Sequence, residues 1–308
     1  MSGIYRKAKR DVSDRKGIIG GSDAGALLGY STYRTPYDVW LSWKGMAPEP
    51  DAETRARFDM GHELEGFIAR QTERIYGCKL RRDTFAHYSA ERPWLICHPD
   101  RIAWIPDGRR IAVEIKSSSV YTNSRWGAPD TDEVPYDYLV QCLMYWYTGV
   151  TDADEMWLMR FSDNRLSRYV IRRDDALIAS VADEIACIVE EKWMKGEAPQ
   201  PGTYAQAVAR YPASGGGAVM ADARTEVACE TYRVLLRQRK AIDEAIDEAK
   251  ASFISYMGGA ETLVGRDGSK LLTYKAQTRQ SIDTKALKAE CPEIAEKYTR
   301  TSTVMVLR

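Results

Sequence analysis

Residues 98–119 constrain the fold of this chain most, because they read as two short apolar strands joined by the tight turn Pro106-Asp107-Gly108. Side chains along a strand point alternately to its two faces. The second strand follows that alternation, with Ile111, Val113 and Ile115 on one face and Ala112, Glu114 and Lys116 on the other. The pattern therefore predicts that Glu114 and Lys116 point the same way.

Asp100 begins the first of these strands, and the turn brings it across from Glu114. Two carboxylates and the ammonium of Lys116 then converge on one point. Such a set suits a hard divalent cation bound by oxygen ligands, with a positive group beside it to orient or deprotonate a water. The alternative is a half-solvated hairpin whose charged residues simply face water, which is the commoner case for a short motif.

An amphipathic helix is predicted over residues 51–77, where apolar residues recur at helical spacing: Phe58, Gly61, Leu64, Phe67, Ile68 and Ile75. Glu65 borders this stripe and is a candidate third carboxylate for a metal site, or else an ordinary surface glutamate. Gly61 lowers helix propensity by about 1 kcal/mol relative to alanine. We expect it to allow close approach of the helix backbone to a strand or to substrate.

A second helix is predicted over residues 132–150, with a start marked by Asp132 or Glu133 and Pro135 and an end marked by Gly149. Gln141 interrupts its apolar and aromatic sequence. A buried glutamine must find hydrogen-bond partners. The expected partners are the Lys116 ammonium or an attacking water.

These segments together resemble the lambda-type alkaline exonucleases, the YqaJ-like viral recombinase family of the PD-(D/E)XK nuclease superfamily. Five pieces carry the resemblance in the family's order, and it covers residues 15 to about 196: residues 15–31, 60–71, 98–105, 113–119 and 138–146. Five ordered motifs are more specific than any one of them.

The resemblance implies a Mg²⁺ site, in which Mn²⁺ would substitute and two ions are expected. It gives each residue a role: Asp100, Glu114 and the backbone carbonyl of Ile115 bind metal, Glu65 supports the second ion, Lys116 activates the water and Gln141 positions it. Catalytic roles are thereby implied for the side chains of Glu65, Asp100, Glu114, Lys116 and Gln141.

The resemblance also implies that Arg15 and Ser22 form a pocket for the 5′ phosphate of a DNA end. Ser22 is predicted to be the N-cap of a short helix, where a hydroxyl and free N–H groups can bind an anion. Without the resemblance, these residues read as a plain helix cap and a solvated arginine. His98 departs from the family's small hydroxyl residue at that position; it is a possible phosphate donor, although a structural histidine is commoner.

The chain has 44 basic and 44 acidic residues, so its net charge is zero. Six basic residues precede the proposed phosphate pocket: Arg6, Lys7, Lys9, Arg10, Arg15 and Lys16. A DNA-binding protein needs positive charge only where the phosphates lie. The neutral total favours contact within a channel, which fits the toroidal homo-oligomer, a trimeric ring, that the resemblance implies.

The six cysteines are scattered, which argues against an iron–sulfur cluster held by four clustered cysteines. No apolar run approaches the roughly 20 residues of a membrane span, and no signal peptide is recognisable. We therefore expect no membrane contact and a cytoplasmic location in a bacterial host cell, with phage or prophage origin implied by the resemblance.

The predicted fold is α/β: a restriction-endonuclease-like core, with a central mixed sheet flanked by helices, and a smaller C-terminal α+β appendage. The core is assigned to residues 1–196, a Pro/Gly-rich linker to 197–223, and the appendage to 224–308. The appendage is predicted to contain a long charged helix, a strand pair, a small helix at 283–297 and a final strand.

The predicted function is a metal-dependent 5′-to-3′ exonuclease that acts on linear double-stranded DNA ends. It would leave 3′ single-stranded DNA for a single-strand annealing protein during phage-type recombination. Two alternatives remain: an endonuclease of the same superfamily and a catalytically inactive DNA-binding scaffold.

Overall fold

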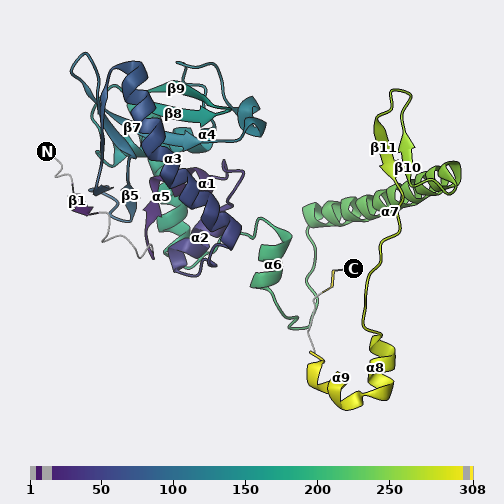
Figure 1. Cartoon of the computed structure of the whole chain (residues 1–308). Helices are drawn as coiled ribbons and strands as arrows, with labels where there is room; N and C mark the ends of the chain where they lie inside the picture. The colour runs from purple at the N-terminus through teal and green to yellow at the C-terminus, as the bar shows by residue number, and fades with distance from the viewer. Residues whose placement is uncertain (1–4, 9–15, 301–305, 308) are drawn as a thin grey trace. The chain divides into compact units, whose positions relative to one another are not determined.

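The computed structural model describes residues 5–8, 16–300, 306 and 307 (Figure 1). The chain divides into two compact units, Met1–Tyr211 and Pro212–Arg308, and the division falls inside the predicted linker. None of the helices in the described part of the chain is both long and apolar enough to cross a membrane.

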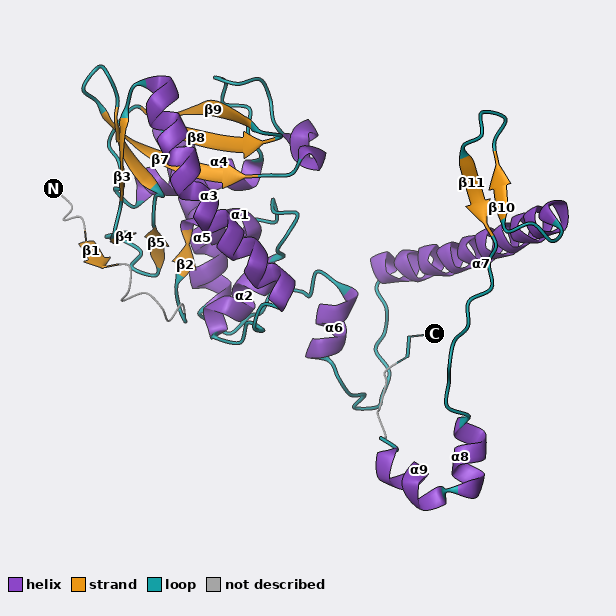
Figure 2. Cartoon of the chain, in the orientation of Figure 1, coloured by secondary structure: helices purple, strands orange, loops and turns teal. Residues whose placement is uncertain are grey.

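A five-stranded mixed sheet forms the centre of the first unit (Figure 2). Its order is β3 (Lys79–Arg82), β6 (Arg101–Trp104), β7 (Arg110–Ser117), β8 (Glu155–Ser162) and β9 (Arg165–Arg172). All neighbouring pairs are antiparallel except β7 and β8, which are parallel. Helix α4 (Tyr136–Tyr147) makes the crossover between these two strands, as a parallel connection requires. Helix α3 (Ala52–Tyr76) precedes the sheet, so the predicted restriction-endonuclease-like class is confirmed.

Helices cover the sheet on both faces: α3 on one, and α4 with α5 (Asp175–Ile188) on the other (Figure 1). Successive side chains of β7 point alternately into these two layers. Ile111, Val113 and Ile115 pack in one core cluster with Ile68 and Ala69 of α3, while Ala112 belongs to the cluster that contains α4. Glu114, which follows the same alternation as Ala112, therefore meets side chains of α4.

The helices predicted over residues 51–77 and 132–150 are confirmed as α3 and α4. The Asp51 carboxylate caps α3 by accepting from the Thr54 N–H at 2.8 Å, and Gly77 ends the helix at φ 63°. Strands β8 and β9 form an antiparallel hairpin, and α5 continues into a π-helical turn, η3 (Val189–Trp193). The 3₁₀ segment η2 (Val120–Arg125) links β7 toward α4.

A second sheet, not predicted from the sequence, lies beside the first, in the order β1 (Tyr5–Ala8), β4 (Phe85–Tyr88), β5 (Leu95–Cys97) and β2 (Ile19–Gly20). Helix α1 (Gly21–Leu27) follows β2 directly. It approaches α4 so closely that a Cβ on Gly25 would lie 2.6 Å from the Cα of Asp137. Only glycine permits this contact, which holds the start of α1 over the sheet.

Part of the predicted linker is ordered in the first unit. Helix α6 (Tyr204–Arg210) presents Gln206, whose Nε2 donates to Asp38 at 2.7 Å. Asp38 lies in α2 (Pro36–Lys44), whose N-cap is Thr35 and whose C-cap is Gly45. The sequence reading of residues 197–223 as a loose connection is therefore wrong for α6, where a helix cap and a long-range contact order the chain.

The second unit contains α7 (Ala223–Met257), the antiparallel pair β10 (Thr262–Val264) and β11 (Lys270–Thr273), and two short helices. The single helix predicted at 283–297 is instead α8 (Thr284–Glu290) and α9 (Pro292–Tyr298). Pro292 explains the break, because proline lacks an N–H and starts a new helix. Most of the predicted final strand lies outside the described residues.

Candidate active site

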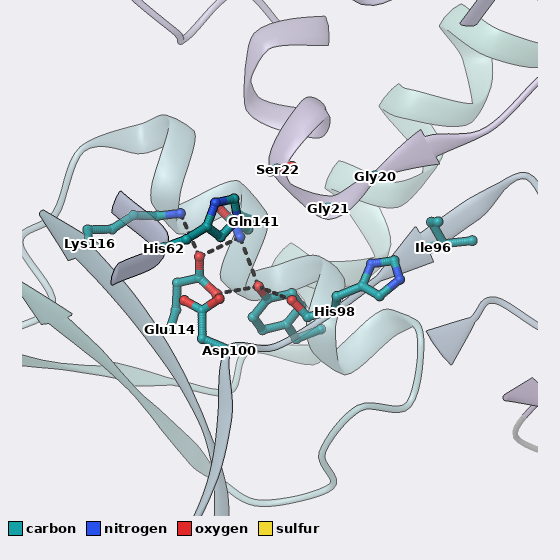
Figure 3. Close-up of a pocket in the computed structure, with 11 residues that line it drawn as sticks. Gly20, Gly21, Ser22, His62, Ile96, His98, Asp100, Glu114, Lys116 and Gln141 are labelled. Carbon is teal, nitrogen blue, oxygen red and sulfur yellow. Dashed lines mark hydrogen bonds and ion pairs between the residues drawn. The ribbon is translucent and has the colours of Figure 1, made fainter. Parts of the chain in front are cut away.

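Asp100, Glu114 and Lys116 meet at a cavity of about 320 Å³ between the sheet, α1 and α4 (Figure 3). A second hollow of about 390 Å³ lies against α3 and shares these three residues and His62. The first cavity is also lined by Gly20, Gly21, Ser22, Ile96, His98, Gln141 and Tyr145. The convergence predicted from the hairpin is thus present in the structure.

Glu114 is a buried carboxylate of the cavity, at 3% exposure. One carboxylate oxygen accepts from Lys116 Nζ at 2.5 Å and from Gln141 Nε2 at 2.8 Å. The other accepts from the Tyr145 hydroxyl at 2.5 Å. Three donors from β7 and α4 hold this carboxylate, which confirms that Glu114 and Lys116 share a face of the strand (Figure 3).

Asp100 lies just before β6, and its Oδ2 accepts from the Ile115 N–H at 2.8 Å. Burial, and then the nearby charge of Glu114, raise the pKa of Asp100 to about 8, against an opposing effect of Lys116. Two carboxylates face one ammonium at this point, so ionisation of both carboxylates leaves an excess of negative charge. This excess, on two carboxylates, fits a divalent cation.

Lys116 completes the cluster. Burial alone would lower its pKa, but the carboxylates of Glu114 and Asp100 raise it above the ordinary lysine value. Lys116 is therefore an ammonium at neutral pH. In that form it can orient a water or stabilise developing negative charge, whereas it cannot accept a proton.

Glu65 lines the hollow against α3 together with Asp100 and Glu114, as the sequence predicted. It pairs there with Arg101, whose Nη1 lies 3.4 Å from its carboxylate. Among the described residues, no three His, Cys, Asp or Glu side chains are already gathered as a metal-binding group. Glu65 is thus near the two central carboxylates but held by an arginine.

Of the two roles expected for Gly61, close approach to a strand is wrong, and close approach to substrate stays a prediction. No heavy atom lies within 4 Å of the position that its Cβ would take, so this glycine does not serve close packing of α3 on a strand. It lines the hollow instead. Several apolar residues of the predicted stripe are also exposed, namely Phe58, Phe67 and Ile75, because only Ile68, Ala69 and Thr72 of α3 are buried.

Of the partners expected for Gln141, Lys116 is corrected and the attacking water stays a prediction. Its Nε2 donates to Glu114 and to the Tyr145 hydroxyl, both at 2.8 Å. A carboxylate oxygen only accepts, so it is the amide nitrogen of Gln141, a donor, that faces Glu114. Tyr145, which sequence reasoning missed, lies four residues after Gln141 on the same helical face; that spacing was the available signal.

His62 is a second lining residue that the sequence reading missed. It lies on α3, three residues before Glu65, and contributes to both cavities.

Burial keeps Tyr145 neutral by raising its pKa well above the ordinary value, an effect that Glu114 strengthens. Tyr145 is therefore a permanent donor to Glu114.

The residues predicted to bind a 5′ phosphate are partly visible. Ser22 is exposed at the cavity, but it is the second residue of α1 rather than its N-cap. Gly20 takes the cap position, and its N–H donates to the Asp23 carboxylate at 3.0 Å, an arrangement that starts the helix two residues early. Arg15 lies outside the described residues.

His98 lines the cavity with its ring, and its backbone carbonyl lies 3.1 Å from the Tyr145 hydroxyl (Figure 3). The residue therefore belongs to the same cluster as Glu114. Its place at the cavity is compatible with both readings of the sequence, a phosphate donor or a structural histidine.

The mixed sheet, its flanking helices and the carboxylate–lysine cluster have the arrangement that the sequence predicted for a nuclease of the PD-(D/E)XK class. Residues 12–154 match the family model for the YqaJ-like viral recombinase domain, so the chain carries this domain and the resemblance seen in the sequence is confirmed. The matched range contains every predicted site residue, from Arg15 to Gln141.

Two known proteins are similar to this chain. The "Uncharacterized protein YqaJ" of Bacillus subtilis (strain 168) is 26% identical over 297 residues, which are 94% of this chain and 89% of that protein. The crystal structure of LHK-Exo in complex with dAMP aligns with 57% of this chain and 88% of its own, at a TM-score of 0.45 and 19% identity. The domain match and the site geometry support a nuclease role in recombination.

Proposed function

We propose that this chain is a metal-dependent 5′-to-3′ exodeoxyribonuclease that acts on linear double-stranded DNA ends and leaves 3′ single strands. The observation that carries the proposal is the Glu114 carboxylate, held by three donors beside Asp100 and Lys116 in an open cavity. A carboxylate fixed so firmly, next to a second whose pKa is raised, is organised to receive a cation and not to stabilise the fold.

Asp100 and Glu114 would hold Mg²⁺, with the Ile115 carbonyl as a further ligand and Glu65 supporting a second ion. Mn²⁺, a similar oxygen-binding cation, would substitute. Bound there, the metal would lower the pKa of a water and neutralise charge on the phosphate. Glu65 would first have to leave its contact with Arg101, which at 3.4 Å is long for a charged hydrogen bond.

The chain's own side chains would position the reactants for phosphodiester hydrolysis. The Lys116 ammonium would orient the attacking water and stabilise the charge that develops on the phosphate. Gln141 and Tyr145 would fix the angle of Glu114, and Gln141 would also position the water through its amide. Rigid support of this kind matters because small displacements of a reacting group slow the reaction strongly.

Ser22 and Arg15 would bind the terminal 5′ phosphate, with His98 as a possible additional donor. Charge-assisted hydrogen bonds contribute roughly 1.5 to 3 kcal/mol each, so a duplex with 5′-hydroxyl ends should be degraded at least about tenfold more slowly than one with 5′-phosphate ends. Arg15→Ala should narrow that difference by slowing the phosphorylated substrate. Equal rates for the two ends in matched salt would rule out the end pocket and the polarity assigned with it.

The test of the whole proposal compares linear duplex DNA with a closed circle of the same sequence in Mg²⁺. An exonuclease degrades only the linear form, an endonuclease of the superfamily cuts both, and an inactive DNA-binding scaffold cuts neither. We further propose that the protein acts in a bacterial cytoplasm on phage or prophage DNA. It would work beside a single-strand annealing protein and assemble as a trimeric ring.

A further inference from the structure

The second unit has almost no interior of its own. Among its described residues, only Met257 and Ala295 are buried, and every residue of α7 except Met257 is exposed. A folded domain of about 100 residues buries well over half of the surface that its extended chain exposes. An amphipathic helix must also bury its apolar stripe against another element. The elements of this unit do not supply that cover.

The apolar stripe of α7 has the spacing of a coiled coil. Residues alternate at intervals of four and three along most of the helix: Ala228, Tyr232, Leu235, Arg239, Ile242, Ile246, Ala249, Phe253 and Tyr256. Arg239 is the one member that is not apolar. Leu235 is 55% exposed, Ile242 59% and Ile246 46%. A sustained repeat of this kind is the pattern with which helices pair side by side.

The last part of the stripe continues into a groove of about 390 Å³ that is lined by residues of α7 and β11. Figure 2 shows the β10–β11 hairpin beside the end of α7. Its lining is apolar and includes Ile246, Phe253 and Leu272. The hairpin therefore extends the apolar surface of α7 without closing it.

Charge is distributed unevenly along α7, and this distribution indicates the partner. Residues 223–240 hold five basic and two acidic side chains, a net charge of +3, whereas residues 241–257 hold four acidic and one basic, a net charge of −3. A second α7 in antiparallel orientation sets each positive half against a negative half. Parallel pairing would set like charges together, which opposes association.

We propose that α7 pairs with the α7 helix of a second copy of this chain, antiparallel and along this stripe. The pairing is isologous, since the same surface is used twice about a two-fold axis. In the register that centres the axis between Arg239 and Ile242, Leu235 lies opposite Ile246 of the second copy. In the same register Tyr232 meets Ala249, and Ala228 meets Phe253. The Leu235–Ile246 layer pairs two large aliphatic side chains, and in the two outer layers a large side chain faces a small one, as close packing requires.

Cysteine cross-linking tests the orientation. In a chain whose exposed Cys187, Cys229 and Cys291 are replaced by serine, Leu235→Cys combined with Ile246→Cys should give a covalent dimer under mild oxidation. The two positions are about 16 Å apart along one helix, so they cannot bridge within it, because a disulfide needs Cα atoms within about 7 Å. Leu235→Cys alone should stay monomeric on a denaturing gel. A dimer from the single variant would show parallel pairing and overturn the proposal.

The solution mass supplies a second, independent test with a matched control. Leu235→Asp should halve the mass of the wild-type assembly by weakening pairing at least about 100-fold, because it buries an unpaired charge. Val234→Asp, one residue away and off the stripe, should keep the wild-type mass. Equal masses for all three chains, with no cross-link, would show that the first unit or another protein covers the stripe. The readout does not depend on nuclease activity or on any assembly of the first unit.

Discussion

Metal binding should release a proton from Asp100, and its pH dependence follows from the cavity. The pKa of this carboxyl is raised to about 8, chiefly by burial and then by Glu114. A cation must displace that proton, so the apparent affinity should rise about tenfold per pH unit below 8 and level off above it. At pH 6 the affinity for the cation should be about 100-fold weaker than the constant value that it reaches well above pH 8.

Calorimetric titration with Ca²⁺, without DNA, measures this directly. Repeating it in two buffers of different ionisation enthalpy counts the protons released. We expect close to one proton at pH 6 to 7 and almost none at pH 9. An affinity that changes less than about threefold between pH 6 and pH 8 would refute the reasoning.

The same carboxyl should make the metal-free protein less stable at high pH. A folded-state pKa of about 8 against the ordinary 3.8 means that the folded protein holds the extra proton between these values. The stabilisation is therefore complete below the unfolded pKa and is lost as pH rises through 8. Between pH 6 and 8 the loss is roughly 2 kcal/mol. Asp100→Asn should remove this slope, and Asp107→Asn, in the exposed turn, should not.

Three further substitutions test single contacts of the site. Lys116→Met should reduce cleavage at least about 100-fold while Ca²⁺ affinity persists; loss of metal binding would contradict its assignment as a positioning cation. Tyr145→Phe should lower the free energy of unfolding by roughly 1.5 to 3 kcal/mol in urea titrations, through loss of its hydrogen bond to Glu114, whereas Tyr147→Phe should change it little. Gly61→Ala should stabilise α3 by up to about 1 kcal/mol, because nothing lies near its Cβ position, and it should nevertheless slow DNA degradation. Gly25→Ala should instead destabilise the protein. A Gly61→Ala variant less stable than Gly25→Ala would count against the packing described.

The central sheet was predictable because its signals are local. The alternation of β7, the turn at Gly108 and the caps of α3 each depend on residues adjacent in sequence. They place Glu114 and Lys116 on one face without knowledge of the rest of the fold. The second sheet was not predictable, because its strands have only two to four residues and therefore carry little periodicity.

Some errors had local causes, and others arose where distant segments decide the outcome. The start of α1 shifted from Ser22 because the Asp23 carboxylate caps the helix at Gly20. Gln141 donates to Glu114 and Tyr145, and the contact with Glu114 depends on how α4 lies across the sheet. For Gly61, packing against a strand was one of two expected roles, and the cavity beside it, formed by residues from several elements, leaves its position open.

The most direct test of the active site is the release of acid-soluble nucleotides from 5′-phosphorylated linear duplex DNA in Mg²⁺. Wild-type protein should release them steadily, and Glu63→Gln, an exposed glutamate on α3, should match it. Glu114→Gln should release none, because it removes the charge that three donors hold in place. Release by Glu114→Gln at the wild-type rate would contradict the assignment of this cavity as the nuclease site.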